Sequence, residues 1–181
     1  MATRSLCYRP SAVARLEIAS PADVRLLDTG LSVGEALAAF NAAHPVAGAV
    51  ASFVGKVRPD GDVKALELTH YEPLTLGGMR DVAERAIERW SLDGLLVWHR
   101  VGTMRPGQTV VLVAAAARHR RAAFEATDFA MDHLKSAAWF WKRERRGHGD
   151  AGAWHWIEPT ERDHADRRRW TVPGGTGPAA G

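Results

Sequence analysis

The chain has 181 residues, of which 46% are hydrophobic and 25% are charged, and its formal net charge is +3. These values are ordinary for a globular protein with a buried core, and the small charge does not indicate a nucleic-acid-binding surface. Because the sequence has one cysteine, no zinc-type spacing of cysteine and histidine, and no apolar run near the roughly 20 residues of a membrane span, we expect a cytoplasmic protein without a disulfide, a metal or a membrane anchor.

One domain is expected over residues 15–160. Residues 1–14 are predicted to be a flexible lead, and residues 161–181 form a C-terminal segment whose Gly/Pro/Ala-rich end we expect to be disordered. Within the domain, the alternating run Arg15 to Ala19 predicts the first strand.

A helix and two strands follow. The helix is predicted over Leu31 to Ala43, where Ser32 and Glu35 have the spacing of a capping box. The strands are predicted over Ala47 to Val57, which is rich in small and β-branched residues, and over Val63 to Tyr71, which alternates cleanly. A polar turn lies between them, so we expect these two strands to pair as a hairpin.

The second half of the domain predicts further helices and strands. Apolar residues at helical spacing predict helices over Thr75 to Trp90 and Arg121 to Leu134. Apolar runs predict a second hairpin from Leu95 to Val101 and Thr109 to Ala116, and a last short strand over Trp154 to Glu158. Strands and helices are mixed and the strands form antiparallel hairpins, so the pattern predicts an α+β fold with packed helices.

Three basic clusters fall at the ends of predicted elements, where binding sites are usually built. The first is Lys56 to Arg58, at the end of a strand. The second is Arg118 to Arg121, at a helix start, where backbone N–H groups would face the same anion. The third holds Lys135 and Lys142, which are seven residues apart and would share one face of a continuous helix.

Trp139, Phe140 and Trp141 stand between these two lysines and would shield them from water. A lysine in such surroundings acts as a base or nucleophile, or stays charged and holds an anion. Each cluster also has a plainer interpretation, as a solvated turn, a charged helix start or an exposed face. Together, without a matching acidic cluster, the three favour a site for a phosphate-bearing substrate.

The most specific signal is a set of six segments in a fixed order. They are FVGKVR (Phe53 to Arg58), LTHYEP (Leu68 to Pro73), HRVG (His99 to Gly102), RHRRAAFEA (Arg118 to Ala126), FAMDHLK (Phe129 to Lys135) and FWKRE (Phe140 to Glu144). With these segments the chain resembles the large, catalytic subunit of molybdopterin synthase over about residues 15–160.

The resemblance implies an α/β-hammerhead type of α+β fold and a sulfurtransferase. Enzymes of this family convert cyclic pyranopterin monophosphate into molybdopterin by adding two sulfurs as a dithiolene, a step of molybdenum cofactor biosynthesis. The sulfur arrives as a thiocarboxylate on the C-terminal Gly-Gly tail of a small ubiquitin-like subunit. The resemblance also implies a homodimer of the catalytic subunit within a heterotetramer, and no cofactor.

Two lysines fall on the family's catalytic positions. Lys135 would act on the thiocarboxylate carbonyl, and Lys142 would hold the pterin or assist proton transfer. Cations there would stabilise negative charge on the tetrahedral centre and on the substrate phosphate. The residues that fall on the substrate-binding pocket are Arg58, His119 and Arg120 for the anion, Lys56, Val57, Arg143 and Glu144 beside it, and Phe53 and Met131 as apolar walls.

The sequence departs from the family pattern at Trp139, where the family often has proline. Proline would end the helix after Lys135, whereas tryptophan permits it to continue. Two arrangements therefore stay open, with Lys135 and Lys142 on one helical face or on two sides of a pocket. The family also uses a C-terminal arginine that reaches the neighbouring protomer's site, and Arg162 lies near that position.

Two other functions stay open at this stage. A non-catalytic paralogue would bind a ubiquitin-like tail or a phosphorylated ligand without chemistry, although such a binder has no need of both lysines. A nucleic-acid binder would account for the arginine-rich runs, but the net charge is small and no nucleic-acid-binding module is recognisable.

Overall fold

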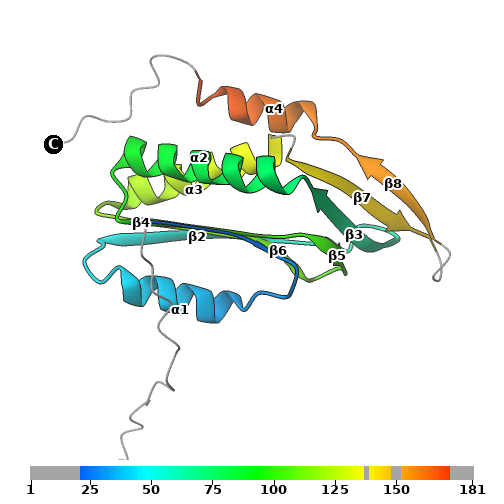
Figure 1. Cartoon of the computed structure of the whole chain (residues 1–181), viewed down its shortest axis with the longest axis horizontal. Helices are drawn as coiled ribbons and strands as arrows, with labels where there is room; N and C mark the ends of the chain where they lie inside the picture. Colours follow the sequence, from blue (N-terminus) through cyan, green and yellow to red (C-terminus); the bar gives the residue numbers. More distant parts are fainter. Residues whose placement is uncertain (1–20, 137–138, 148–151, 172–181) are drawn as a thin grey trace, which may run out of the picture.

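The computed structural model describes residues 21–136, 139–147 and 152–171, which form two β-sheets and four helices (Figure 1). In chain order the elements are β1 (Ala22–Leu27), α1 (Val33–Ala43), β2 (Ala49–Lys56), β3 (Val63–His70), α2 (Glu72–Trp90), β4 (Gly94–Arg100), β5 (Gly102–Met104), β6 (Thr109–Ala117), α3 (Arg120–Ser136), β7 (Phe140–Arg146), β8 (Ala153–Ile157) and α4 (Glu161–Arg168). The predicted α+β class, with antiparallel strands and packed helices, is confirmed.

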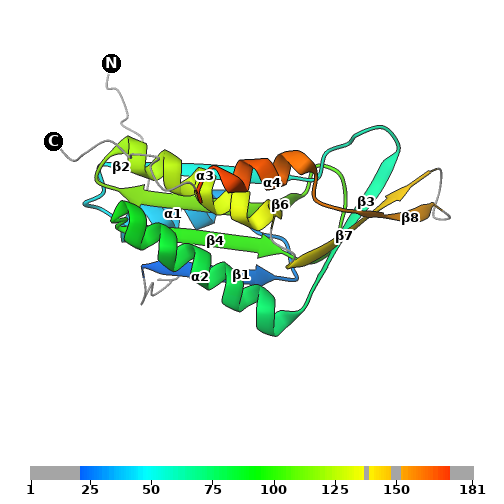
Figure 2. The same ribbon diagram turned by 90° about the horizontal axis from the view of Figure 1, so that it is seen from above.

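The two sheets lie end to end. The first has the strand order β1-β4-β6-β2 and the second β5-β3-β7-β8. β1 is parallel to β4, and the other strand pairs are antiparallel. α1 covers one face of the first sheet, and α2 and α3 cover the opposite face (Figures 1 and 2). α4 lies on the outer side of α3 (Figure 1), so it forms a further layer on that side of the molecule.

The core lies on both faces of the first sheet because its central strands, β4 and β6, are apolar over most of their length. In β6, Val111, Val113 and Ala115 pack toward α2 and α3, whereas Leu112 and Ala114 pack toward α1. This is the two-residue alternation of a strand that is buried on both faces. A smaller apolar cluster joins the second sheet to the first, made by Val57, Leu66, Leu68 and Met104.

Most predicted elements are confirmed, with each end at most three residues from its predicted position. This applies to α1, α2, α3, β2, β3, β4, β6 and β8, and β4 pairs with β6 as the predicted second hairpin. Apolar periodicity therefore located the elements correctly. Within the described residues, no helix combines the length and apolar character needed to cross a lipid bilayer.

The predicted hairpin of β2 with β3 is wrong. β2 pairs along its whole length with β6, and β3 is instead an inner strand of the second sheet, between β5 and β7. The polar turn after Val57 does reverse the chain direction, but it carries the chain from one sheet into the other. β6 is the longest described strand and is apolar from Val110 to Ala117, so it offers β2 a longer and more deeply buried partner than β3 does.

The N-terminal part of the domain differs from the prediction in two details. The strand expected at Arg15 to Ala19 lies outside the described residues, and the structure shows β1 at Ala22–Leu27. Ser32 is the N-cap of α1, as expected, but its side chain makes no capping hydrogen bond with the described part of the chain, so the expected capping box with Glu35 does not form.

Candidate functional site

The two lysines singled out from the sequence lie on different elements. Lys135 is exposed in the last turn of α3, which ends at Ser136, and Lys142 is half-buried on β7. The arrangement with both lysines on one helical face is therefore wrong. The helix ends although Trp139 stands where the family often has proline, so another feature must turn the chain.

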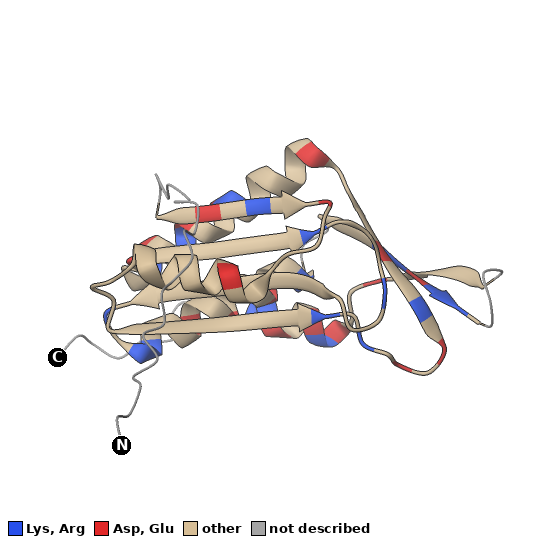
Figure 3. Ribbon diagram, turned by 90° about the horizontal axis from the view of Figure 1, so that it is seen from below, with Lys and Arg blue, Asp and Glu red and all other residues tan. Residues whose placement is uncertain are grey.

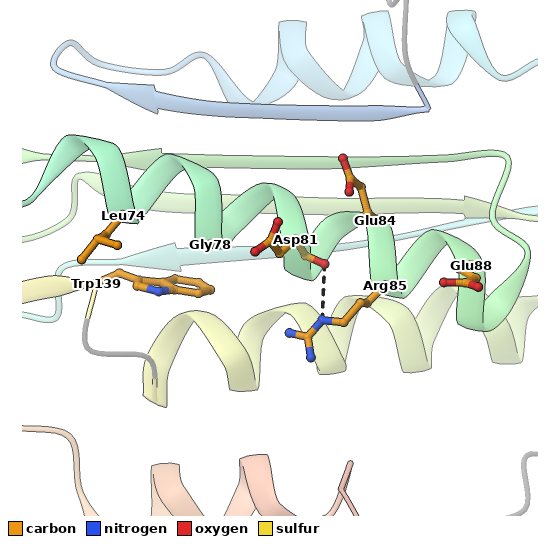
Figure 4. A pocket seen from close by; sticks show the side chains of 7 residues that line it. All are labelled: Leu74, Gly78, Asp81, Glu84, Arg85, Glu88 and Trp139. Carbon is orange, nitrogen blue, oxygen red and sulfur yellow. Dashed lines mark hydrogen bonds between the residues drawn. The ribbon is translucent and has the colours of Figure 1, made fainter.

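That feature is the packing of Trp139 on α2. A Cβ atom at Gly78 would lie 2.4–2.6 Å from three atoms of the Trp139 indole, so only glycine leaves room for the ring. The buried Thr75 hydroxyl, one turn earlier, lies 3.0 Å from the Trp139 carbonyl oxygen and from that of Tyr71. Figure 4 shows the indole lying along α2 beside Gly78. This anchor directs the chain from α3 into β7.

A groove of about 670 Å³ runs along α2 beside the indole (Figure 4). Three carboxylates line it, those of Asp81, Glu84 and Glu88, together with Arg85, whose Nε donates to the Asp81 carbonyl oxygen at 3.3 Å. The excess of negative charge would repel an anionic substrate. The groove is therefore not the site that the basic clusters predict, and the lysine pair is the better candidate.

Strand register places Lys142 near the segment that leads into α4. Lys142 lies opposite Leu68 of β3 on one side and opposite Ile157 of β8 on the other. α4 begins shortly after Ile157, with Thr160 as its N-cap and Asp163 in its first turn. The positive charges of both lysines act on the Asp163 carboxylate. The lysines therefore lie on two different elements, and a pocket between them stays a prediction.

The pKa of the Asp163 carboxyl lies below its usual value. Partial burial acts in the opposite direction, but it is outweighed by hydrogen bonds from the Thr160 hydroxyl and backbone N–H and by the charges of Lys135 and Lys142. The carboxylate is therefore ionised at neutral pH. The sequence analysis did not select Asp163, although the spacing Thr160-x-x-Asp163 is that of a capping box and could have shown it.

The neighbours of Lys142 on β7 have other partners. Adjacent residues of a strand point to opposite faces of a sheet, so Arg143 faces away from Lys142. Arg143 forms an ion pair with Glu67 and lies over the rings of Trp154 and Trp156, at 4.7 Å and 5.5 Å. The Arg143 side chain, which was predicted to lie beside the substrate pocket, thus makes its contacts within the second sheet.

Glu144 is on the same face of β7 as Lys142 and accepts a hydrogen bond from Arg146 at 2.7 Å. It was predicted to lie beside the pocket, and its face of the strand is compatible with that position. Its carboxylate is nevertheless paired with arginine, so it adds little negative charge to the surroundings of the lysines.

In the first basic cluster, Lys56 to Arg58, one residue is buried in the core and two lie on the surface. Val57 is 5% exposed and its side chain packs in the apolar cluster between the sheets, so it belongs to the core. Lys56 is exposed at the end of β2, and the exposed Arg58 lies 3.1 Å from Asp60. Figure 3 shows little charge along most strands of the first sheet and basic residues at one end of the sheet, where β2 ends at Lys56 and β4 ends at Arg100.

The second basic cluster lies at the other end of the sheet. β6 runs antiparallel to β2, so the residues that follow β6 lie near the start of β2 and not near Lys56. His119 and Arg120 are exposed there, at the start of α3. Lys135 is fifteen positions after Arg120 along the helix, a rise of roughly 22 Å. A single chain therefore does not bring the predicted anion-binding residues His119 and Arg120 to the lysine pair.

Phe53 and Met131, the residues predicted to form apolar walls, lie near the end of the first sheet where the last turn of α3 carries Lys135. Met131 is one turn before Lys135 on α3 and is 7% exposed within the main core. Phe53 is on β2, three residues before Lys56, and is 38% exposed. Phe53 is the one of the two that offers apolar surface to a ligand. Within residues 21–136, 139–147 and 152–171, no group of three or more histidine, cysteine or acidic side chains could hold a metal ion.

Comparisons with known proteins show which family the chain is similar to. A family model described as MoaE protein matches residues 26–137. The molybdopterin synthase catalytic subunit of Caulobacter vibrioides is 45% identical over 148 residues, which cover 81% of this chain and 96% of that protein.

Solved structures share the fold. The molybdopterin cofactor biosynthesis protein E from Burkholderia multivorans has a TM-score of 0.70 at 36% identity, over 83% of this chain and 97% of that chain. The complex of subunits 1 and 2 of molybdopterin-converting factor from Helicobacter pylori contains a chain with a TM-score of 0.61 at 22% identity, over 71% of this chain and 90% of that chain, a likeness of fold alone.

Proposed function

This chain belongs to the MoaE protein family, and from that premise we propose that it is the catalytic subunit of a molybdopterin synthase, a sulfurtransferase of molybdenum cofactor biosynthesis. Its substrate is cyclic pyranopterin monophosphate, and its sulfur donor is a small ubiquitin-like subunit with a thiocarboxylated Gly-Gly tail. The observation that carries this proposal is the lysine pair at the junction of α3, β7 and α4. The cytoplasmic location expected from the sequence is part of the same proposal.

Lys135 and Lys142 are the proposed catalytic residues. Each sulfur transfer breaks the carbon–sulfur bond of a thiocarboxylate, through a centre that carries negative charge on oxygen. An ammonium group aimed at that oxygen stabilises the charge as it develops. Lys135 is exposed and accessible to an incoming tail, whereas the half-buried Lys142 is better placed to hold the pterin. These roles agree with those that the resemblance implies.

The substrate phosphate is proposed to meet basic residues from two copies of the chain. Lys56 and Arg58 lie at the same end of the first sheet as the C-terminal end of α3. His119 and Arg120 lie roughly 22 Å from Lys135 along α3 and can contribute only from a second copy. The separation supports the homodimer within a heterotetramer that the resemblance implies.

The test is product formation in a mixture of the chain, the thiocarboxylated small subunit and cyclic pyranopterin monophosphate, followed by mass spectrometry. We expect Lys135→Ala to form little or no molybdopterin, and Lys142→Ala to be strongly impaired. Lys64→Ala is the matched control, since Lys64 is an exposed lysine of β3, outside the proposed site. Turnover by Lys135→Ala at the rate of the unmodified chain would refute its role, and binding of the small subunit by the unmodified chain without product would indicate a non-catalytic paralogue.

A further inference from the structure

The arginine at the end of β4 is buried without a counterion. Arg100 is 7% exposed, and among the described residues it is the one arginine that is buried. Its Nη1 donates to the Thr109 carbonyl oxygen at 3.2 Å, whereas its Nε is buried and has no hydrogen-bond partner in the described part of the chain. A guanidinium stays charged and carries five N–H donors, so the described residues use only a small part of its bonding capacity.

No described carboxylate neutralises this charge. Asp28 follows Leu27, the residue opposite Arg100 on β1, but it is exposed and forms no ion pair within the described residues. By contrast, the half-buried Arg25 and Arg143 each pair with a carboxylate. Because an uncompensated buried charge destabilises a fold, the surroundings of Arg100 favour a ligand that brings negative charge.

Lys56 lies on the same face and at the same end of the first sheet as Arg100. In β4, Trp98 packs toward α1, so the alternation of a strand places Arg100 on that side too. In β2, a Cβ atom at Gly55 would lie 2.6 Å from Val111 Cγ1, on the side of α2 and α3, so the next residue, Lys56, is on the α1 side. Figure 3 shows basic residues at this end of the sheet.

Backbone contacts fix the spacing between the two cations. β6 lies between β4 and β2, so the backbones of Arg100 and Lys56 are two strand spacings apart, roughly 10 Å. Lys56 is opposite Thr109, the residue whose carbonyl oxygen accepts from Arg100. The Gly107 N–H donates to the Val57 carbonyl oxygen at 2.8 Å, which holds the turn before β6 against the end of β2. Two long basic side chains at this spacing reach one phosphate group between them.

We propose that Arg100 and Lys56 form a phosphate-binding site at the end of the first sheet, on the side that α1 covers. The buried guanidinium supplies a fixed positive charge, and the exposed Lys56 ammonium holds the ligand from the surface. A phosphate group fits because it brings negative charge and several acceptor oxygens to unused donors. The pterin substrate of the proposed function is one source of that group and free phosphate is another, so only the identity of the source rests on the proposed function.

The test is calorimetric titration of the full chain with inorganic phosphate. We expect Arg100→Gln and Lys56→Gln each to bind phosphate about fivefold more weakly or less tightly still, because each removes one positive charge beside the ligand. Arg80→Gln and Lys64→Gln are the matched controls, since these residues are exposed on α2 and β3, and both should keep the affinity of the unmodified chain.

Two variants separate charge from folding. Arg100→Lys keeps the positive charge and should keep most of the affinity, whereas a purely structural role of Arg100 would lower the affinity equally in Arg100→Lys and Arg100→Gln. If Arg100→Gln does not fold, Lys56→Gln at its exposed position decides. Unchanged phosphate affinity in Lys56→Gln or in folded Arg100→Gln, or no phosphate binding by the unmodified chain, would overturn the proposal.

The KM for cyclic pyranopterin monophosphate, measured by product formation, identifies the source of the phosphate group. If the pterin occupies the site, Arg100→Gln should raise KM about fivefold with little change in kcat, since neither Arg100 nor Lys56 acts on the sulfur transfer. An unchanged KM together with weaker phosphate binding would exclude the pterin and leave a site for free phosphate. If the unmodified chain forms no product, the proposed function fails, yet the phosphate affinities still decide the site.

Discussion

From the burial of His99 we predict that the folded chain loses stability in acid. The side chain is 7% exposed, its ring stacks on Phe140 with centroids 4.2 Å apart, and its Nδ1 lies 2.9 Å from the Arg100 carbonyl oxygen. Because that oxygen can only accept, Nδ1 carries the proton and donates it. Burial lowers the pKa of His99 to about 4, against an ordinary value of 6.5, although the hydrogen bond to Arg100 acts in the opposite direction.

The sign and size of the effect follow from linkage. Between pH 6.5 and about 4 the unfolded chain binds a proton at His99 that the folded chain does not, so stability falls as the pH falls through this window and the loss levels off below it. The loss amounts to about 1.4 kcal/mol at pH 5.5 and about 2.5 kcal/mol at pH 4.5, relative to pH 7.5.

Urea unfolding of the unmodified chain and of His99→Phe, at pH 7.5, 5.5 and 4.5, isolates this contribution. Phenylalanine preserves the stacked ring but cannot titrate, so the variant starts less stable at pH 7.5 because it leaves the Arg100 carbonyl without its donor. The difference in free energy of unfolding between the unmodified chain and the variant should then shrink by the amounts given above as the pH falls. A difference between the two proteins that stays constant with pH would refute the argument that His99 is buried in its neutral form.

Further predictions concern the elements that surround the lysine pair. Gly78→Ala should destabilise the fold by about 1–3 kcal/mol because its Cβ would overlap the Trp139 indole, whereas Gly77→Ala, with nothing within 4 Å of the added atom, should stabilise it by about 0.5–1 kcal/mol in thermal or urea unfolding. Equal changes in the free energy of unfolding for the two substitutions would show that the Trp139 indole does not pack against Gly78. Asp132→Asn should cost about 2 kcal/mol and increase hydrogen exchange selectively in α4, because it removes the charged acceptor of Arg169 and Trp170. Unchanged exchange in α4 would show that this carboxylate does not hold the helix. Thr75→Val should cost about 1 kcal/mol in the same unfolding assay, since it removes the hydroxyl beside the Trp139 carbonyl oxygen, and an effect within error would exclude that hydrogen bond.

Local sequence patterns located most elements because hydrophobic periodicity is a local property. α2 and α3 have continuous apolar stripes, and β4 and β6 are apolar runs of strand length. β1 was missed although Val24 and Leu26 alternate with Asp23 and Arg25. The neighbouring run at residues 15–19 alternates as well, and the pattern alone does not choose between two such short runs.

Strand partners could not be predicted in the same way. A turn shows where the chain reverses, but not which strand a new strand will pair with. β2 therefore seemed to pair with the next strand in sequence, whereas its partner β6 is more than fifty residues further along. That pairing depends on buried area that only the assembled sheet provides.

The candidate site was predictable in its residues and not in its geometry. The family resemblance selected Lys135 and Lys142, but the chain path between them depends on Gly78 and Thr75 of α2, which are more than fifty residues away in sequence. The basic clusters at the ends of different elements were also expected to form one site. Antiparallel strands, however, place their C-terminal ends at opposite ends of a sheet. For this reason His119 lies far from Lys135 within one chain.

The most direct test of the central claim is the mass of the pterin product. The unmodified chain is incubated with cyclic pyranopterin monophosphate and an excess of the thiocarboxylated small subunit, and the pterin is then analysed by mass spectrometry. The account predicts a product that carries two sulfur atoms, with the small subunit recovered as its carboxylate. Recovery of sulfur-free pterin and intact thiocarboxylate, from a mixture in which the two proteins have bound each other, would contradict it.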